Sequence, residues 1–194
     1  MSHECSKAAL RRLHDPAFMA RYFVGDALDV GAGEDGLSKQ MHLWPLLRSV
    51  RDWDVGDGDA QELVGIPDAS FDLVHSSHSL EHMRGAGSAI LRWLDVVKPG
   101  GHIVILVPDE DLYEQGVFPS TFNPDHKATF TMWKAESWAR SFSVNLVDIV
   151  CACTKALLVK MERLEHTWNP QGGRYDRTAG VGESAIEMVL RRRA

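Results

Sequence analysis

The chain has 194 residues, of which 44% are hydrophobic and 25% are charged, and its formal net charge at pH 7 is −6. This length and composition predict one globular domain, residues 1–194, with a sizeable buried core. The negative charge argues against nucleic acid as a partner, because nucleic-acid-binding domains usually carry a basic face. No apolar run reaches the ~18 residues of a membrane span, so no membrane association is expected.

The spacing of the three cysteines indicates whether the protein is expected in an oxidising or a reducing compartment. Cys5, Cys151 and Cys153 form no C-x-x-C pair, and the last two are predicted to share one face of a strand. That spacing suits neither a disulfide framework nor a zinc site. Free thiols are typical of a reducing compartment, so we expect a cytoplasmic protein.

Short apolar segments alternate with helical patterns through the first half of the chain. Helices are predicted at 3–24, with a break at Asp15-Pro16, and at 37–47 and 88–97. Strands are predicted at 27–30, 49–54, 71–76 and 102–107. This alternation predicts an α/β, Rossmann-like, doubly wound fold with a mostly parallel sheet and helices on both faces.

The second half is less regular. Residues 108–136 are rich in Pro, Asp, Asn, His and aromatic side chains and have no clean period, which predicts a substrate-covering insertion. Residues 144–150 and 185–192 are predicted as the final strands, the last one alternating in polarity and antiparallel. A mobile loop at 166–182 is expected between them.

A glycine-rich turn follows the first strand. Gly31, Gly33 and Gly36 fit the G-x-G-x-x-G pattern of a nucleotide-binding strand-turn-helix, which dehydrogenases and methyltransferases both use. Asp29 stands two residues before the first glycine. A carboxylate there favours a cationic ligand, whereas a pyrophosphate would prefer an uncharged position. The alternative is a structural acid that caps the turn.

Four segments together resemble the class I S-adenosylmethionine-dependent methyltransferases. They are the glycine turn at 28–36, the Gly-Asp-Ala and Phe-Asp-Leu-Val run within 57–74, the Ser-x-x-Leu-Glu-His segment ending at His82, and Lys98-Pro-Gly-Gly101. The resemblance implies S-adenosylmethionine as the cofactor and methyl transfer to oxygen or nitrogen of a small-molecule acceptor. It implies that Asp29, Gly31, Ala32 and Gly33 hold the methionine and ribose portions.

The resemblance also implies contacts to the adenosine portion. Asp59 would accept the adenine amino group and the Ala60 amide would reach a ring nitrogen. An acid at the end of the second strand would accept the ribose hydroxyls; Asp54 is favoured and Asp52 stays open. Only about two dozen residues separate Gly36 from Asp59, which predicts a sheet trimmed at this edge.

Histidines cluster after the 71–76 strand. His75, His78 and His82 could bind a metal, but no H-x-x-x-H pair with a nearby catalytic acid accompanies them. We therefore expect no metal here, and expect Ser77 and His78 to line the cofactor pocket at the carboxyl edge of the sheet.

Acceptor-binding residues are expected in the insertion. Tyr113, Asp125 and His126 could bind an acceptor or take its proton. Equally, Asp125 and His126 could tie the loop down through turn hydrogen bonds. A dedicated base is optional, because positioning supplies much of the acceleration of a direct displacement at sulfonium.

Two other functions fit parts of the sequence. An NAD(P)-dependent oxidoreductase shares the glycine pattern, although no Tyr-x-x-x-Lys pair is present. A non-catalytic S-adenosylmethionine-binding module would keep the fold and bind a ligand without turnover.

Overall fold

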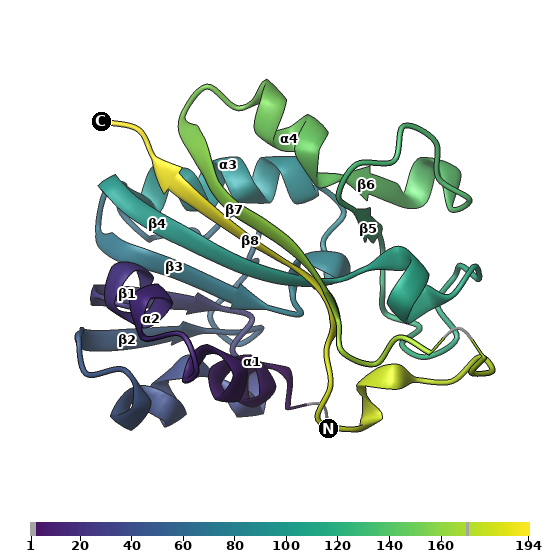
Figure 1. Ribbon diagram of the computed structural model, residues 1–194. Coiled ribbons are helices and arrows are strands. Elements are labelled where there is room, and N and C mark those ends of the chain that lie inside the picture. Colours follow the sequence, from purple (N-terminus) through teal and green to yellow (C-terminus); the bar gives the residue numbers. More distant parts are fainter. Residues whose placement is uncertain (1–2, 170) are drawn as a thin grey trace.

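Six strands form one sheet in the order β2-β1-β3-β4-β8-β7 (Figure 1). The computed structural model describes residues 3–169 and 171–194. The strands are β1 (Gly25–Val30), β2 (Leu47–Trp53), β3 (Phe71–Ser77), β4 (Val97–Pro108), β7 (Ala156–Glu165) and β8 (Ser184–Arg192). The first four are parallel, while β8 runs antiparallel to both of its neighbours. This confirms the predicted fold class.

Helices cover both faces of the sheet. In Figure 1, α2 (Pro16–Tyr22) lies in front of β1, α1 (Glu4–Arg12) lies below the strands on the same side of the sheet, and α3 (Ala86–Val96) lies behind β3 and β4. α4 (Leu146–Ala152) follows β6 (Ser143–Asn145), which pairs with β5 (Thr129–Thr131) in a second, two-stranded sheet. Single turns of 3-10 helix occupy 33–35, 80–82, 140–142 and 177–179, a longer 3-10 helix spans Leu37–Leu43, and a π-helix spans Glu110–Glu114.

Each face of the sheet has its own core, because successive strand residues point to opposite faces. Leu28, Val30 and Val74 pack with the apolar side of α3, including Trp93. Ala27, Leu73 and Val104 pack with the aromatic residues of the other layer, which are Phe18, Tyr22, Phe23 and Trp44. Asp29 and His75 are on this second face, directed toward α1.

The break predicted at Asp15-Pro16 is confirmed. Asp15 is the N-cap of α2, where its side chain accepts a hydrogen bond from the Phe18 amide at 2.9 Å. Pro16 is the first helical residue, where a missing N–H costs nothing. The chain therefore turns between α1 and α2.

The prediction of a strand at 144–150 is wrong. β6 ends at Asn145, whose side chain accepts a hydrogen bond from the Val147 amide at 3.0 Å and starts α4. A cap overrides the strand preference of the valines and isoleucine that follow. Cys151 is consequently in a helix and Cys153 directly after it, so they do not share a strand face.

Four further differences from the predicted elements concern one helix and three strands. The predicted 37–47 helix is a 3-10 helix that ends at Leu43, because Pro45 precedes the start of β2. β4 begins at Val97 and includes the Pro-Gly-Gly turn. β7 was not predicted at all, and β8 is buried from Ser184 to Leu190 instead of alternating, because β7 and the helical layers enclose it.

Within residues 3–169 and 171–194, no strand lies beyond β2 at this edge of the sheet, as the short interval between Gly36 and Asp59 predicts. Between Asp54 and Ser70 the chain forms turns but no strand, so β2 is the edge strand. The loop predicted at 166–182 contains one 3-10 turn; its residue 170 lies outside the described part. No helix among the described residues is long and apolar enough to span a bilayer.

Candidate cofactor and acceptor site

Two cavities meet at the carboxyl ends of β1 and β3. The smaller has a volume of about 140 Å³ and the larger about 520 Å³, and both are lined by Gly31 and His78. Every residue predicted to bind the cofactor lines one or both of them: Asp29, Gly31, Ala32, Gly33, Asp54, Asp59, Ala60, Ser77 and His78. The residues predicted from the sequence therefore lie around two adjacent cavities, and their role in cofactor binding stays a prediction.

Asp29 is a fixed, buried carboxylate in the smaller cavity. One oxygen, Oδ2, accepts a hydrogen bond from the Leu37 amide, and Oδ1 lies 2.6 Å from His75 Nδ1. Arg12 Nη1 approaches His75 Nε2 at 3.1 Å. Because an arginine can only donate, His75 Nε2 accepts and its Nδ1–H is donated to Asp29. Both oxygens are therefore held before any ligand binds.

Acidic side chains surround the smaller cavity. Glu4, Asp29, Glu34 and Asp35 all line it, and no lysine or arginine does. Glu4 comes from α1, is 5% exposed, and has one carboxylate oxygen without a hydrogen-bond partner among the described residues. Such a cavity suits a cationic group, because opposite charge is worth most where water is excluded.

The three glycines of the turn are needed for different reasons, either backbone conformation or lack of space for a side chain. Gly31 and Gly33 have φ angles of +77° and +53°, which favour glycine. A Cβ on Gly31 would lie 2.1 Å from Ser79 Oγ, whereas one on Gly33 would meet nothing within 4 Å. Gly36 has an ordinary φ, but its Cβ would lie 2.9 Å from that of Ala32.

We expect Gly31→Ala to destabilise the fold by about 2 kcal/mol, because it adds a left-handed alanine and a steric conflict with Ser79. Urea unfolding followed by circular dichroism measures this. The matched control is Gly33→Ala, which adds the same backbone strain in open space and should cost about 1 kcal/mol. Equal losses in the two variants would contradict the steric argument.

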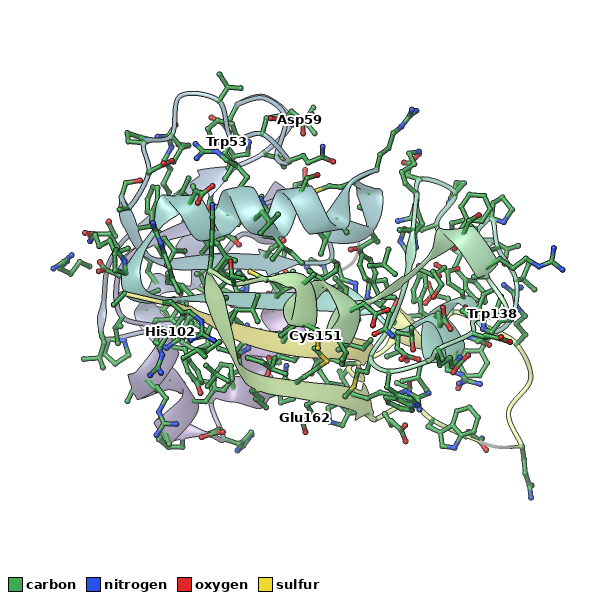
Figure 2. All side chains as sticks on the ribbon, turned by 90° about the horizontal axis from the view of Figure 1, so that it is seen from above. Trp53, Asp59, His102, Trp138, Cys151 and Glu162 are labelled. Atoms are coloured by element: carbon green, nitrogen blue, oxygen red, sulfur yellow. The ribbon has the colours of Figure 1, made fainter. Side chains whose placement is uncertain are left out.

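Two tryptophans hold the loop that forms the wall of the larger cavity. Trp53 Nε1 donates to the Gly58 carbonyl at 3.2 Å, and Trp93 Nε1 donates to the Ala60 carbonyl at 2.9 Å. Figure 2 shows Asp59, which is on this loop, near Trp53 at the end of β2. The Asp59 side chain is exposed and accepts a hydrogen bond from the Gln61 amide.

The two candidate ribose acids point to different places. Asp54 lines the larger cavity. Asp52 instead accepts a hydrogen bond from the Ser38 hydroxyl at 2.5 Å and packs against the turn at Gly36. Asp52 lines neither cavity.

His78 lies where the two cavities join. Its φ is +52°, and its ring nitrogens are 3.5 Å from Glu81 and 3.6 Å from Glu4. Burial opposes a charged imidazole, but the hydrogen bond and charge of Glu81, with the charge of Glu4, outweigh it and raise the pKa of His78.

The three candidate acceptor residues are only partly brought together. The rings of Tyr113 and His126 are 5.2 Å apart, and His126 Nδ1 lies 2.6 Å from Glu114 Oε1. Burial raises the pKa of Tyr113, so its hydroxyl stays protonated near neutral pH. Asp125 is exposed, and only its backbone carbonyl joins the group, 3.3 Å from His82 Nδ1. None of the three lines either cavity.

Sequence reasoning missed several residues of the site. Glu4 and Cys5 line the smaller cavity, and His82 and Met83 line the larger one. No signal pointed to Glu4, because it precedes the glycine turn by more than two dozen residues. The sequence indicates His82 only as a possible metal ligand. Its ring lies 5.1 Å from that of His126, and this contact links the larger cavity to the insertion.

Comparison with known proteins agrees with this architecture. Residues 36–105 match a family described as a methyltransferase domain, while no curated protein matches. A crystal structure of a SAM-dependent methyltransferase from Archaeoglobus fulgidus has 17% identity, covers 98% of this chain and 94% of its own, and gives a TM-score of 0.64. SAM-dependent methyltransferases from Methanosarcina mazei have 13% identity, coverages of 92% and 97%, and a TM-score of 0.55.

A third similar structure contains ligands. The 1,6-didemethyltoxoflavin-N1-methyltransferase of Burkholderia thailandensis has 15% identity, with coverages of 98% of this chain and 79% of its own. Its TM-score is 0.53, and it holds 1,6-didemethyltoxoflavin and S-adenosylhomocysteine. At these identities the likeness concerns the fold.

Proposed function

We propose that this chain, whose residues 36–105 match a methyltransferase-domain family and whose fold resembles that of SAM-dependent methyltransferases, transfers a methyl group from S-adenosylmethionine to a small-molecule acceptor. The observation that carries the proposal is the pair of joined cavities, one small and acidic and the other larger, at the carboxyl edge of a parallel sheet. Ligands of open α/β sheets bind at this edge.

The smaller cavity takes the methionine portion. Its ammonium and sulfonium groups are positive, and the fixed carboxylate of Asp29 lies among other acids there. The backbone of Gly31, Ala32 and Gly33 lies against the ligand. A pyrophosphate, which a nicotinamide cofactor would bring, would be repelled by the same acids.

The larger cavity takes the adenosine portion. Asp54 accepts the ribose hydroxyls, Asp59 accepts the adenine amino group, and the Ala60 amide donates to a ring nitrogen. His78 lines both cavities and Ser77 the smaller one, so both would lie near the sulfonium group. The tryptophan hydrogen bonds to Gly58 and Ala60 support this assignment because they fix the loop before the ligand arrives.

The acceptor is a small molecule that is methylated on oxygen or nitrogen and enters beside the insertion at 108–136 of this single domain. Tyr113, Asp125 and His126 contribute to acceptor binding, and the net charge of −6 supports a small molecule over nucleic acid. Transfer is a direct displacement in which positioning supplies much of the acceleration. We place the protein in the cytoplasm, a location supported by its three free cysteines.

Asp59→Ala is expected to weaken S-adenosylmethionine binding by about 10-fold, because the variant loses a hydrogen bond to a charged acceptor. Isothermal titration with S-adenosylmethionine and S-adenosylhomocysteine measures the change. Glu62→Ala is the matched control, because Glu62 is an exposed acid of the same loop outside the cavity. Failure of the unaltered protein to bind either compound would refute the proposed function.

A further inference from the structure

A second group of ligand-type side chains lies between the larger cavity and the insertion. Glu81, His82 and His126 each offer one ligand atom, and the three atoms lie within 4.8 Å of one another. The amides of Lys127 and Ala128 donate to the Glu81 carbonyl at 2.8 and 3.2 Å, which ties the turn after β3 to the insertion. The three side chains therefore meet through backbone hydrogen bonds that the fold supplies.

Both histidines are oriented through the same ring nitrogen. Nδ1 of His126 lies 2.6 Å from Glu114 Oε1, and Nδ1 of His82 lies 3.3 Å from the Asp125 carbonyl. An Nδ1–H donated to an oxygen leaves Nε2 with a free lone pair. Carboxylate and carbonyl partners of this kind typically orient histidines that bind metals.

The carboxylate of Glu81 provides an independent observation. The residue is 1% exposed, and its Oε2 has no hydrogen-bond partner among the residues that the structure describes. Its other oxygen is 3.5 Å from His78 Nδ1. A buried carboxylate oxygen without a partner is costly, and a bound cation would remove that cost.

We propose that Glu81, His82 and His126 bind a divalent first-row transition-metal ion. Two imidazoles and one carboxylate suit Mn²⁺, Fe²⁺, Co²⁺ or Zn²⁺ better than Mg²⁺ or Ca²⁺, which prefer oxygen ligands. Three protein ligands leave coordination positions open for water or for an acceptor oxygen.

The alternative histidine groups do not offer such a site. In the neighbouring set of Cys5, Asp29 and His75, both ring nitrogens of His75 are already engaged, by Asp29 and by Arg12. His78 points toward Glu4 and Glu81. The proposed site therefore differs from the His75, His78 and His82 grouping that the sequence indicates.

The position of the ion has a consequence that rests on the proposed function. His82 lines the cavity assigned to adenosine, and Tyr113 lies beside His126 on the insertion. An ion held by these residues would face an acceptor next to the cofactor. An acceptor with a hydroxyl, phenolate or carboxylate oxygen would bind it directly.

The test is metal binding by the purified full chain. After treatment with EDTA, the protein is titrated with Co²⁺, Mn²⁺, Zn²⁺ and Mg²⁺, and bound metal is counted by elemental analysis. We expect one equivalent of transition metal, visible absorption bands from bound Co²⁺, and little retention of Mg²⁺. Absence of stoichiometric binding of Co²⁺, Mn²⁺ and Zn²⁺ would overturn the proposal.

Two variants locate the site. His82→Ala removes an exposed ligand and Glu81→Gln a buried one, and each should weaken Co²⁺ binding at least ~10-fold. His42→Ala, at another exposed histidine, is the control and should bind as the unaltered protein does. Unchanged Co²⁺ binding by folded His82→Ala would refute the site even if Glu81→Gln failed to fold. Titration with S-adenosylhomocysteine in EDTA tests the cofactor site separately, so the two proposals can fail independently.

Discussion

Replacement of Asp29 by asparagine is expected to weaken S-adenosylmethionine binding by between about 10- and 100-fold, which corresponds to a lost charge-assisted interaction of ~1.5–3 kcal/mol. The substitution removes the negative charge from the fixed carboxylate of the smaller cavity. It also leaves His75 Nδ1–H, which lies 2.6 Å from Asp29 Oδ1, with a weaker neutral acceptor or with none. Isothermal titration at constant ionic strength measures the affinity.

Asp52→Asn is the matched control for this experiment. Asp52 is on the adjacent strand, and its side chain contacts Ser38 outside both cavities. Thermal unfolding of both variants shows whether Asp29→Asn has disturbed the fold through Leu37 or His75. An affinity for S-adenosylmethionine that stays unchanged in folded Asp29→Asn would show that this carboxylate has only a structural role.

A second large effect is expected from Glu187→Gln, which should lower the free energy of unfolding by about 3–5 kcal/mol at pH 7. Glu187 is fully buried on β8, where it lies 2.7 Å from Arg11, 2.8 Å from Arg12 and 3.0 Å from Lys160. Removing its charge leaves three cations close together without their central partner. Urea unfolding measures the loss.

This stabilisation depends on pH in a defined direction. Burial alone would raise the pKa of Glu187, but Arg12, Arg11 and Lys160 outweigh it and hold the pKa far below the usual range. A carboxylate with a lowered folded-state pKa stabilises the protein above its unfolded value of ~4.3, and the contribution is lost as the pH falls below that value. The difference between the unaltered protein and Glu187→Gln should therefore be largest near neutral pH and shrink below pH ~4.

Glu162→Gln on β7 is the control for the charge cluster. Glu162 also contacts Lys160, at 2.7 Å, but its side chain is 49% exposed. Figure 2 labels its position on β7. An exposed ion pair contributes less than about 1 kcal/mol. Equal destabilisation by the two substitutions would contradict the role of burial.

The sequence predicted best those parts of the protein whose residues are close together in the chain. The glycine turn, the strand before it and Asp29 follow each other directly, and Asp54 and Asp59 come just after the next strand. The methyltransferase resemblance therefore identified residues that line one pair of cavities. The proposed metal site could not be predicted from the sequence, because Glu81, His82 and His126 meet only where a turn pairs with residues 127–128.

Tertiary contacts decided what the sequence did not reveal. Val144–Val150 has a composition typical of a strand, but the Asn145 cap and packing against β7 favour a helix. β7 is an edge strand, and edge strands often carry charged side chains such as those of Lys160 and Glu162. These charged residues interrupt the apolar pattern by which a strand is recognised in the sequence. Glu4 reaches the cavity because α1 packs against the glycine turn, where Ser6 donates to Asp35.

The contacts of α1 join residues that are far apart in the sequence. Arg12 connects Glu187 on β8 to His75 and, through it, to Asp29 in the smaller cavity. Arg11 also pairs with Glu183 and Glu187. During synthesis on the ribosome, α1 emerges before β8, and the acids that fix α1 follow it by more than 170 residues. Fragments that stop before Glu183 would contain the glycine turn and Asp29 with its partners Leu37 and His75. They would lack the two acids that pair with Arg11 and Arg12 and thereby fix α1, the helix that carries Glu4.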